Sequence, residues 1–251
     1  MRKNTLTICC LLSLSLSVAT SHAGWKDLVK DIKESGEQIL QQPDNTTTSN
    51  LDTSTLIAGL KEALQVGSQR VVETVSQPGG YLDNPKIRIP LPPSIDKVAG
   101  ILKKYGLESQ VTEFEHSINR AAENAAPQAA ELLVTAVKEM SIEDAKKIYQ
   151  GADNAATEYF EEHTRGKLQQ LFMPEVNSSL QQVGATRYYS QLAGEAKSLP
   201  YVGDQLNVDL DQYVTDQALD GLFTMLAVEE KKIRDNPAAR TTELLKQVFS
   251  Q

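Results

Sequence analysis

Residues 111–140 constrain the fold more than any other stretch of this chain. Their apolar side chains recur at the three- and four-residue spacing of a helix, and many of them are alanines. Six apolar residues share one face of this predicted helix: Val111, Phe114, Ile118, Ala121, Ala122 and Ala125. Because alanine is small, we expect a neighbouring helix to pack closely against that face. Pro127 is expected to kink the helix or to restart it as a first-turn residue.

Helical spacing continues through nearly all of the remaining chain, with one exception. Residues 81–93 contain four prolines, which fix their own φ angles and push the residues before them toward extended geometry. Ile87, Ile89 and Leu91 alternate with polar residues or proline there, so their side chains should press against the helices. The sequence therefore predicts an all-α fold, a multi-helix globular bundle crossed by one proline-rich extended strap.

Local signals predict where several helices begin and end. Ser94 and Ser141 are both candidate N-caps, and Asp144, three residues after Ser141, completes the pattern of a capping box. Asp153 is expected to cap the next helix. Pro174 is expected to interrupt the helix that contains it.

The longest run of helical spacing is residues 209–234. Its two halves place their apolar residues on nearly opposite sides, so the run is either buried all round or broken near Asp216. We favour burial, because Gly221 inside a helix often marks close backbone packing. Asn236 and Pro237 then predict the start of a last helix.

The N-terminus has the pattern of a secretory signal peptide over residues 1–23. Arg2 and Lys3 precede an apolar run at residues 6–19, and Ser-His-Ala at residues 21–23 matches a cleavage site. We therefore expect a mature chain that begins at Gly24 and a periplasmic location, with no transmembrane segment after cleavage. Residues 24–54 are predicted to form an amphipathic helix and a flexible linker, and residues 55–251 the helical domain.

Charge and cysteine content exclude some classes of function. The chain carries 25 Lys and Arg against 33 Asp and Glu, and loss of the predicted signal peptide leaves a net charge of −10. This balance argues against nucleic-acid binding, which depends on neutralising phosphates. Cys9 and Cys10 both lie in the signal peptide, so the mature chain is expected to have no disulfide and no cysteine nucleophile.

One group of polar residues is the best candidate for a site: Arg88, Glu115, Asn119, Arg120 and Glu123. The residues at positions 115, 119 and 123 follow at i, i+4 and i+8, so they form a ridge beside the alanine-rich face. Three interpretations stay open. The group could be an internal polar network that pins the strap, the polar lining of a small-ligand or peptide pocket, or a catalytic pair of carboxylates at positions 115 and 123.

Other patterns give weaker evidence for chemistry. Glu113 and His116 have the Glu-x-x-His spacing of a di-iron helix, but the matching position before His163 is Phe160, so a second motif is missing. The sequence has no Gly-x-Ser-x-Gly motif and no glycine-rich phosphate loop. We therefore expect neither a metal nor a cofactor.

Seven short segments together resemble a bacterial family known as domain of unknown function 4197 (DUF4197). They are GLKEAL at 59–64, NPKIRIP at 84–90, Phe114 with Glu115, NRAAE at 119–123, MSIEDA at 140–145, AATEYF at 155–160 and NPAART at 236–241. The resemblance implies an exported helical protein and carries no assigned activity.

Three functional hypotheses follow. The first is a non-catalytic binding or interaction module of the cell envelope, with an unknown protein or a small apolar ligand as its partner. The alternative is a carboxylate-dependent hydrolase or other enzyme. A third is a structural protein that acts through the predicted helix at residues 24–41. A buried, fully paired Arg88–Glu115 network with no adjoining cavity would favour the first, and an open cleft with Glu115 and Glu123 facing water would favour the second.

Overall fold

The computed structural model describes residues 53–197 and 208–235. All of them belong to the second of two compact units, Thr47–Gln251. The predicted signal peptide, the predicted helix at residues 24–41 and the predicted last helix after Asn236 lie outside the described residues. Within the described residues every regular element is a helix, so the all-α prediction is confirmed.

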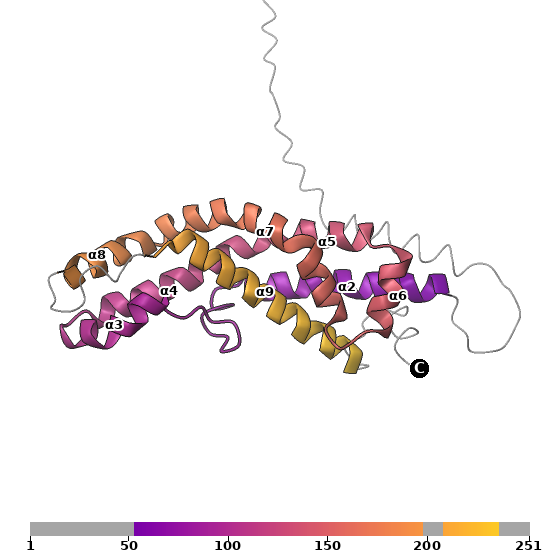
Figure 1. Cartoon of the computed structure of the whole chain (residues 1–251), viewed down its shortest axis with the longest axis horizontal. Helices are drawn as coiled ribbons and strands as arrows, with labels where there is room; N and C mark the ends of the chain where they lie inside the picture. The colour runs from indigo at the N-terminus through magenta and orange to yellow at the C-terminus, as the bar shows by residue number, and fades with distance from the viewer. Residues whose placement is uncertain (1–52, 198–207, 236–251) are drawn as a thin grey trace, which may run out of the picture. The chain divides into compact units, whose positions relative to one another are not determined.

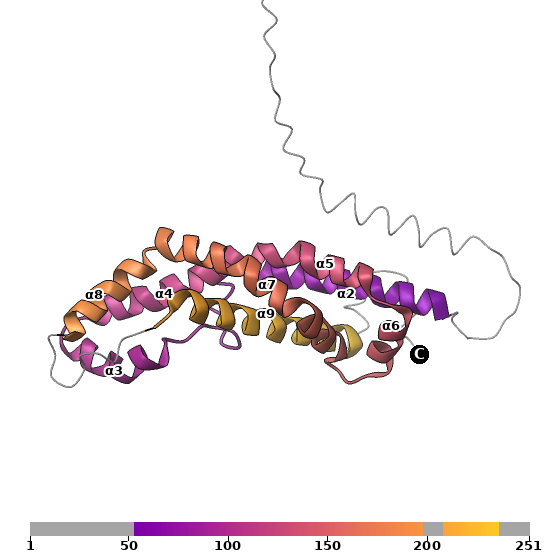
Figure 2. The ribbon, with the colours of Figure 1, turned by 45° about the horizontal axis from the view of Figure 1, so that its top comes forward.

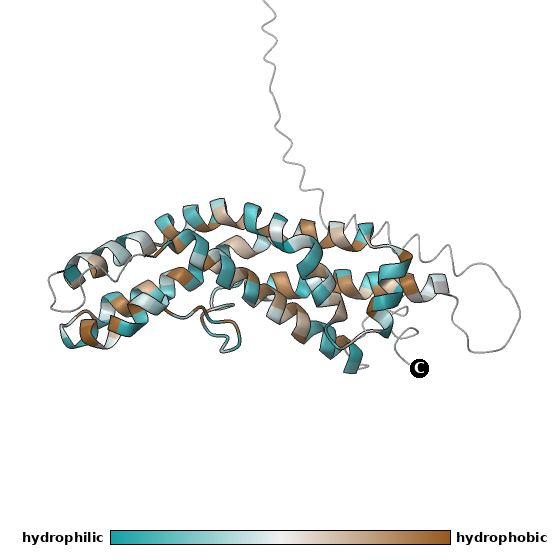
Figure 3. Ribbon diagram, in the orientation of Figure 1, coloured by the Kyte–Doolittle hydropathy of each residue, from teal (hydrophilic) through white to brown (hydrophobic). Residues whose placement is uncertain are grey.

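The helices pack side by side in one bundle. They are α2 (Thr53–Val75), α3 (Pro93–Lys104), α4 (Glu108–Ala125), the short 3-10 helix η1 (Ala126–Gln128), α5 (Ala129–Glu139), α6 (Ile142–Gln150), α7 (Ala155–Gln182), α8 (Ala185–Lys197) and α9 (Leu210–Asp235). Helix α7 packs against both α9 and α4, and α2 packs against α9 and α5 (Figures 1 and 2). Most helices show both brown and teal segments, as expected for helices with one apolar side (Figure 3).

Helix α4 contains the alanine-rich face that the sequence predicts. All six of its predicted face residues are buried, with at most 2 % of their surface exposed. Pro127 lies in η1, which joins α4 to α5 without a sharp break. Proline is tolerated in this first-turn position because its missing N–H would have no helical partner there. Because α4 contacts α3, α7, α8 and α9, its small side chains lie at the centre of the bundle.

The proline-rich segment is only partly extended, which corrects the predicted strap. Most of residues 76–87 form successive turns, and within this segment residues 88–92 are the longest run that is neither helix nor turn. Backbone bonds such as Asp83 N–H to the Gly79 carbonyl, at 2.9 Å, close these turns, and Gly79 adopts the positive φ of +84° that favours glycine. The predicted burial of Ile87 and Ile89 is confirmed, whereas Leu91 is only partly buried.

The predicted helix starts are right in one case and wrong in two. Ser141 and Asp144 form the full capping box of α6. Ser94, however, lies inside α3, which begins at Pro93 and has no side-chain cap. Asp153 does not cap α7 either, because its carboxylate pairs with Lys231 at 2.8 Å.

Pro174 does not interrupt its helix, contrary to the prediction. Helix α7 runs unbroken through it and is longer than α9, at 28 against 26 residues. Phe172 and Val176, on either side of the proline, are fully buried, so tertiary packing holds both halves of the helix in line. The helix loses one backbone hydrogen bond there, because proline has no N–H to donate to the carbonyl four residues earlier.

Helix α9 is a single helix buried on several sides, as predicted. Its buried residues include Val214, Leu219 and Leu222, which point in different directions around the axis. Gly221 permits a close approach: a Cβ at that position would lie 2.6 Å from Cε1 of Tyr81 and 3.2 Å from Cβ of Ile87. Both neighbours belong to residues 81–92, which we call the turn segment, so Gly221 allows this segment to pack directly on α9.

Substitution Gly221→Ala is therefore expected to destabilise the protein, by roughly 1–3 kcal/mol, because the ring of Tyr81 must shift to admit the methyl group. The matched control is Gly194→Ala in α8, where a Cβ would meet no atom within 4 Å. Alanine there should stabilise the helix by up to about 1 kcal/mol. Urea unfolding of both variants measures the difference, and equal effects at both sites would contradict the packing argument.

Candidate functional site

Asn119 binds the backbone of the turn segment with its side-chain amide. Its Oδ1 accepts a hydrogen bond from the Ile89 N–H at 2.8 Å, and its Nδ2 donates to the Ile89 carbonyl at 2.9 Å. The same Nδ2 also donates to the Glu115 carbonyl at 2.9 Å, one turn earlier in α4. Asn119 is fully buried, so its amide replaces the partners that a neighbouring strand would give to Ile89.

Glu123 makes a second connection to the same segment, one turn further along α4. Its Oε1 accepts hydrogen bonds from the N–H groups of Tyr81 and Leu82, at 3.2 and 3.3 Å. Its Oε2 lies 3.5 Å from Nε of Arg120, whose side chain is 53 % exposed. Glu123 itself is 1 % exposed, so a carboxylate is held inside the protein by two backbone donors and one cation at the surface.

Arg88 and Glu115 form the outer end of this polar seam, the group of residues 88, 115, 119, 120 and 123. Nε of Arg88 lies 3.0 Å from Oε1 of Glu115, and both side chains are partly exposed. An ion pair of this exposure adds little to stability, on the order of 0–1 kcal/mol. Asn119 and Glu123, the buried residues of the seam, therefore contribute most to the stability of the contact between α4 and the turn segment.

Tyr81 fixes the start of the turn segment from the opposite side. Its ring is fully buried, and its hydroxyl donates to the Ala218 carbonyl of α9 at 2.7 Å. Burial, together with the nearby negative charge of Glu123, raises the pKa of Tyr81 well above its usual value. The phenol therefore stays neutral and keeps its donor proton, so α4 and α9 both hold the segment.

The structure brings all five candidate site residues together where α4 meets the turn segment. Arg88 pairs with Glu115, whereas Asn119 and Glu123 bind main-chain groups of the segment rather than the Arg88 side chain. Four cavities among the described residues are lined by other side chains and not by these five. The seam thus has the geometry of an internal structural contact between α4 and the turn segment.

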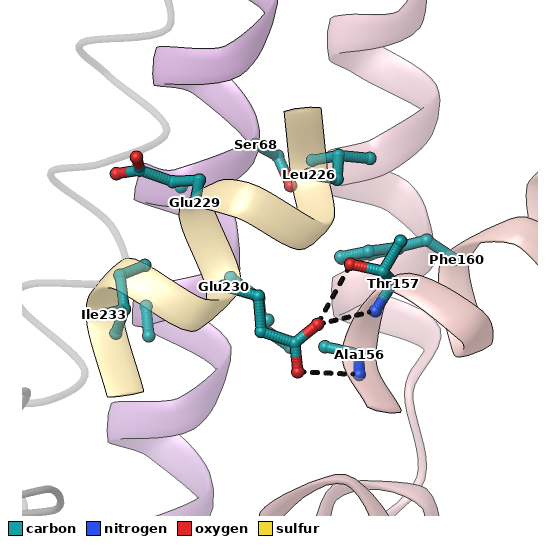
Figure 4. A pocket seen from close by; sticks show the side chains of 11 residues that line it. Ser68, Ala156, Thr157, Phe160, Leu226, Glu229, Glu230 and Ile233 are labelled. Carbon is teal, nitrogen blue, oxygen red and sulfur yellow. Dashed lines mark hydrogen bonds between the residues drawn. The ribbon is translucent and has the colours of Figure 1, made fainter. Parts of the chain in front are cut away.

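A second buried polar cluster, which the sequence analysis missed, lies at the start of α7 (Figure 4). Glu230 of α9 accepts hydrogen bonds from the N–H groups of Ala156 and Thr157, at 3.0 and 2.9 Å, and from the Thr157 hydroxyl at 2.9 Å. These donors belong to the first turn of α7, where N–H groups have no helical partner. Glu230 therefore caps α7 from another helix, in the place predicted for Asp153.

Arg234 and a small cavity complete this cluster. The Arg234 guanidinium lies 2.8 Å from Glu230 and donates to the Ile148 carbonyl at 2.9 Å. The adjoining cavity has a volume of about 20 Å³, which is enough for a water molecule but not for an organic ligand. The one signal in the sequence is a glutamate at position 230, where the spacing of Leu226 and Ile233 predicts a buried side.

Neither a metal-binding cluster nor a membrane-spanning helix is found in the described part of the chain. His116 is half-buried, and residues 53–197 and 208–235 contain no group of three or more His, Cys, Asp or Glu placed to share a metal ion. Within those residues no helix combines the length and apolar character needed to cross a membrane.

The fold and the seam define a class: an all-helical protein whose central helix holds a turn segment through buried polar side chains. Comparison with known proteins agrees with the resemblance of the short motifs. Residues 50–250 match the family described as Protein of unknown function (DUF4197), so the chain belongs to this family. No curated protein and no solved structure matches the chain significantly.

Proposed function

We propose that this protein is a non-catalytic binding module of the cell envelope, exported through a cleaved signal peptide at residues 1–23. The N-terminal basic residues, apolar run and small-residue cleavage site support export. The proposed partner is another protein or a small apolar ligand. Periplasmic location is part of the proposal.

One observation supports the absence of catalysis in this proposal: the carboxylates of the seam already form hydrogen bonds or an ion pair within the protein. A general acid or base must reach the proton that it transfers. Glu123 is buried and bonded to two backbone N–H groups, and Glu115 is paired with Arg88. This arrangement favours a structural role for both carboxylates over the alternative of a carboxylate-dependent hydrolase.

Export is tested by the mass of the mature protein. The full chain is expressed in a Gram-negative host, and the periplasmic product is expected to begin at Gly24. The matched control is Ala23→Arg, which removes the small residue at the cleavage point and should leave the signal peptide attached. Recovery of the uncleaved wild-type chain from the cytoplasm would contradict the proposal.

Binding is tested by native mass spectrometry of protein purified from the periplasm. We expect a bound species that is absent after denaturation. Hydrolysis of a panel of ester and glycoside substrates is measured beside it, on the wild type and on Glu115→Gln. The proposal predicts no activity that depends on Glu115. A folded Glu115→Gln variant that loses a hydrolytic activity of the wild type would overturn it.

A further inference from the structure

The largest of the described cavities is an open groove on α7, with a volume of about 730 Å³. It is centred on the proline that was expected to break the helix. Its lining residues are Gly166, Gln169, Gln170, Met173, Pro174, Asn177 and Asp211. From Gly166 to Asn177 the groove follows about 17 Å of helix, at 1.5 Å per residue. An extended peptide of about five residues has the same length.

The groove exposes hydrogen-bonding groups that suit a peptide backbone. Pro174 has no N–H, so the Gln170 carbonyl loses its usual helical partner and is left as an acceptor. The side-chain amide of Gln170 can both donate and accept, whereas the amides of Gln169 and Asn177 already bond to neighbouring side chains. Met173 and Pro174 supply an apolar floor, and methionine adapts its shape to different partners. A main chain with alternating donors and acceptors fits such a lining.

The charge of the groove indicates the side chains that the peptide should carry. Helices α7 and α9 run antiparallel, and beyond the Glu230 cap three further carboxylates of α9 contact α7. Asp220 meets the cation of Arg165, and Asp216 meets the amides of Gln169 and Gln212. Asp211, at the groove, meets only the amide of Asn177, at 2.6 Å, and has no cationic partner within the described residues.

We propose that this groove binds an extended segment of a partner protein that carries lysine side chains. The segment lies along α7 over Met173 and Pro174, donates a main-chain N–H to the Gln170 carbonyl, and places one ammonium group against Asp211. This assignment rests on the proposed binding function and names its site and its kind of partner. A free amine would contact Asp211 but would leave most of the groove empty.

The test uses the mature protein and a capped five-residue peptide, alanine with lysine at positions 2 and 4. Binding is followed by backbone NMR shifts in low salt. We expect shifts at residues 166–177 and near Asp211, and at least fivefold weaker binding to Asp211→Asn. The matched control is Glu143→Gln, which removes the same charge from an exposed position of α6 and should bind like the wild type. The same peptide with glutamate in place of lysine should not bind.

A second variant separates binding from folding. Pro174→Ala restores the missing N–H to α7, so it is expected to raise the Tm by several degrees and to weaken peptide binding, because the Gln170 carbonyl is then occupied. A more stable protein with weaker binding cannot be explained by misfolding.

Three outcomes would overturn the proposal. Equal weakening in Asp211→Asn and Glu143→Gln would show attraction by net charge alone. Spermidine that binds the groove as tightly as the peptide would assign the site to free amines. Absence of peptide binding, with a different ligand found by native mass spectrometry, would refute the groove assignment and leave the proposed binding function standing.

Discussion

Substitution Asn119→Ala is expected to lower the free energy of unfolding by about 3 kcal/mol, because it leaves two buried backbone groups without partners. The N–H and the carbonyl of Ile89 are both bonded to the Asn119 amide, and Ile89 is 1 % exposed. Water cannot replace the lost amide without opening the contact between α4 and the turn segment. Urea unfolding followed by circular dichroism measures the effect.

The matched control for this substitution is Asn124→Ala. Asn124 belongs to the same helix but is exposed, and alanine is the better helix former. Its effect is expected to stay within about 0.5 kcal/mol. If the two variants unfold at the same urea concentration, Asn119 does not hold the segment.

Substitution Glu230→Ala is expected to be at least as damaging, with a loss of about 4 kcal/mol, because it breaks a buried ion pair and a helix cap together. The first-turn N–H groups of Ala156 and Thr157 lose their acceptor, and the guanidinium of Arg234, 15 % exposed, loses the carboxylate of its ion pair. Unfolding in urea measures this loss as well. Amide exchange should also become faster in the first turn of α7.

Glu229→Ala is the matched control, one residue away on the same helix. Glu229 pairs with Arg70 and Lys232, whose side chains are both more exposed than that of Arg234. Its removal is expected to cost about 1 kcal/mol. If Glu229→Ala destabilises the protein as much as Glu230→Ala, negative charge in this region, and not the cap on α7, stabilises the fold.

The parts of the fold that depend on neighbouring residues were predictable from the sequence. Spacing alone identified the buried face of α4, from Val111 to Ala125, because burial of one side imposes its own period. The capping box of Ser141 and Asp144 was predictable for the same reason, since both partners lie within one turn.

The parts that depend on distant residues were not predictable. Pro174 breaks a helix in isolation, but in this fold packing on both of its sides holds α7 straight. Asp153 is close in sequence to the start of α7, yet the cap comes from Glu230, 73 residues beyond Thr157. In the seam, the sequence indicated which polar residues lie together but not what they bind, because side-chain patterns do not reveal which main-chain groups a fold leaves unpaired.

The central claim is that buried side chains of α4 hold the turn segment as an integral part of the bundle. Amide hydrogen exchange at Ile89 tests this claim most directly, because its N–H has the Asn119 side chain as its acceptor. We predict that it exchanges as slowly as the core amides of α4, and that Asn119→Ala abolishes this protection. Exchange of the wild-type Ile89 amide at the rate of an open loop would contradict the account.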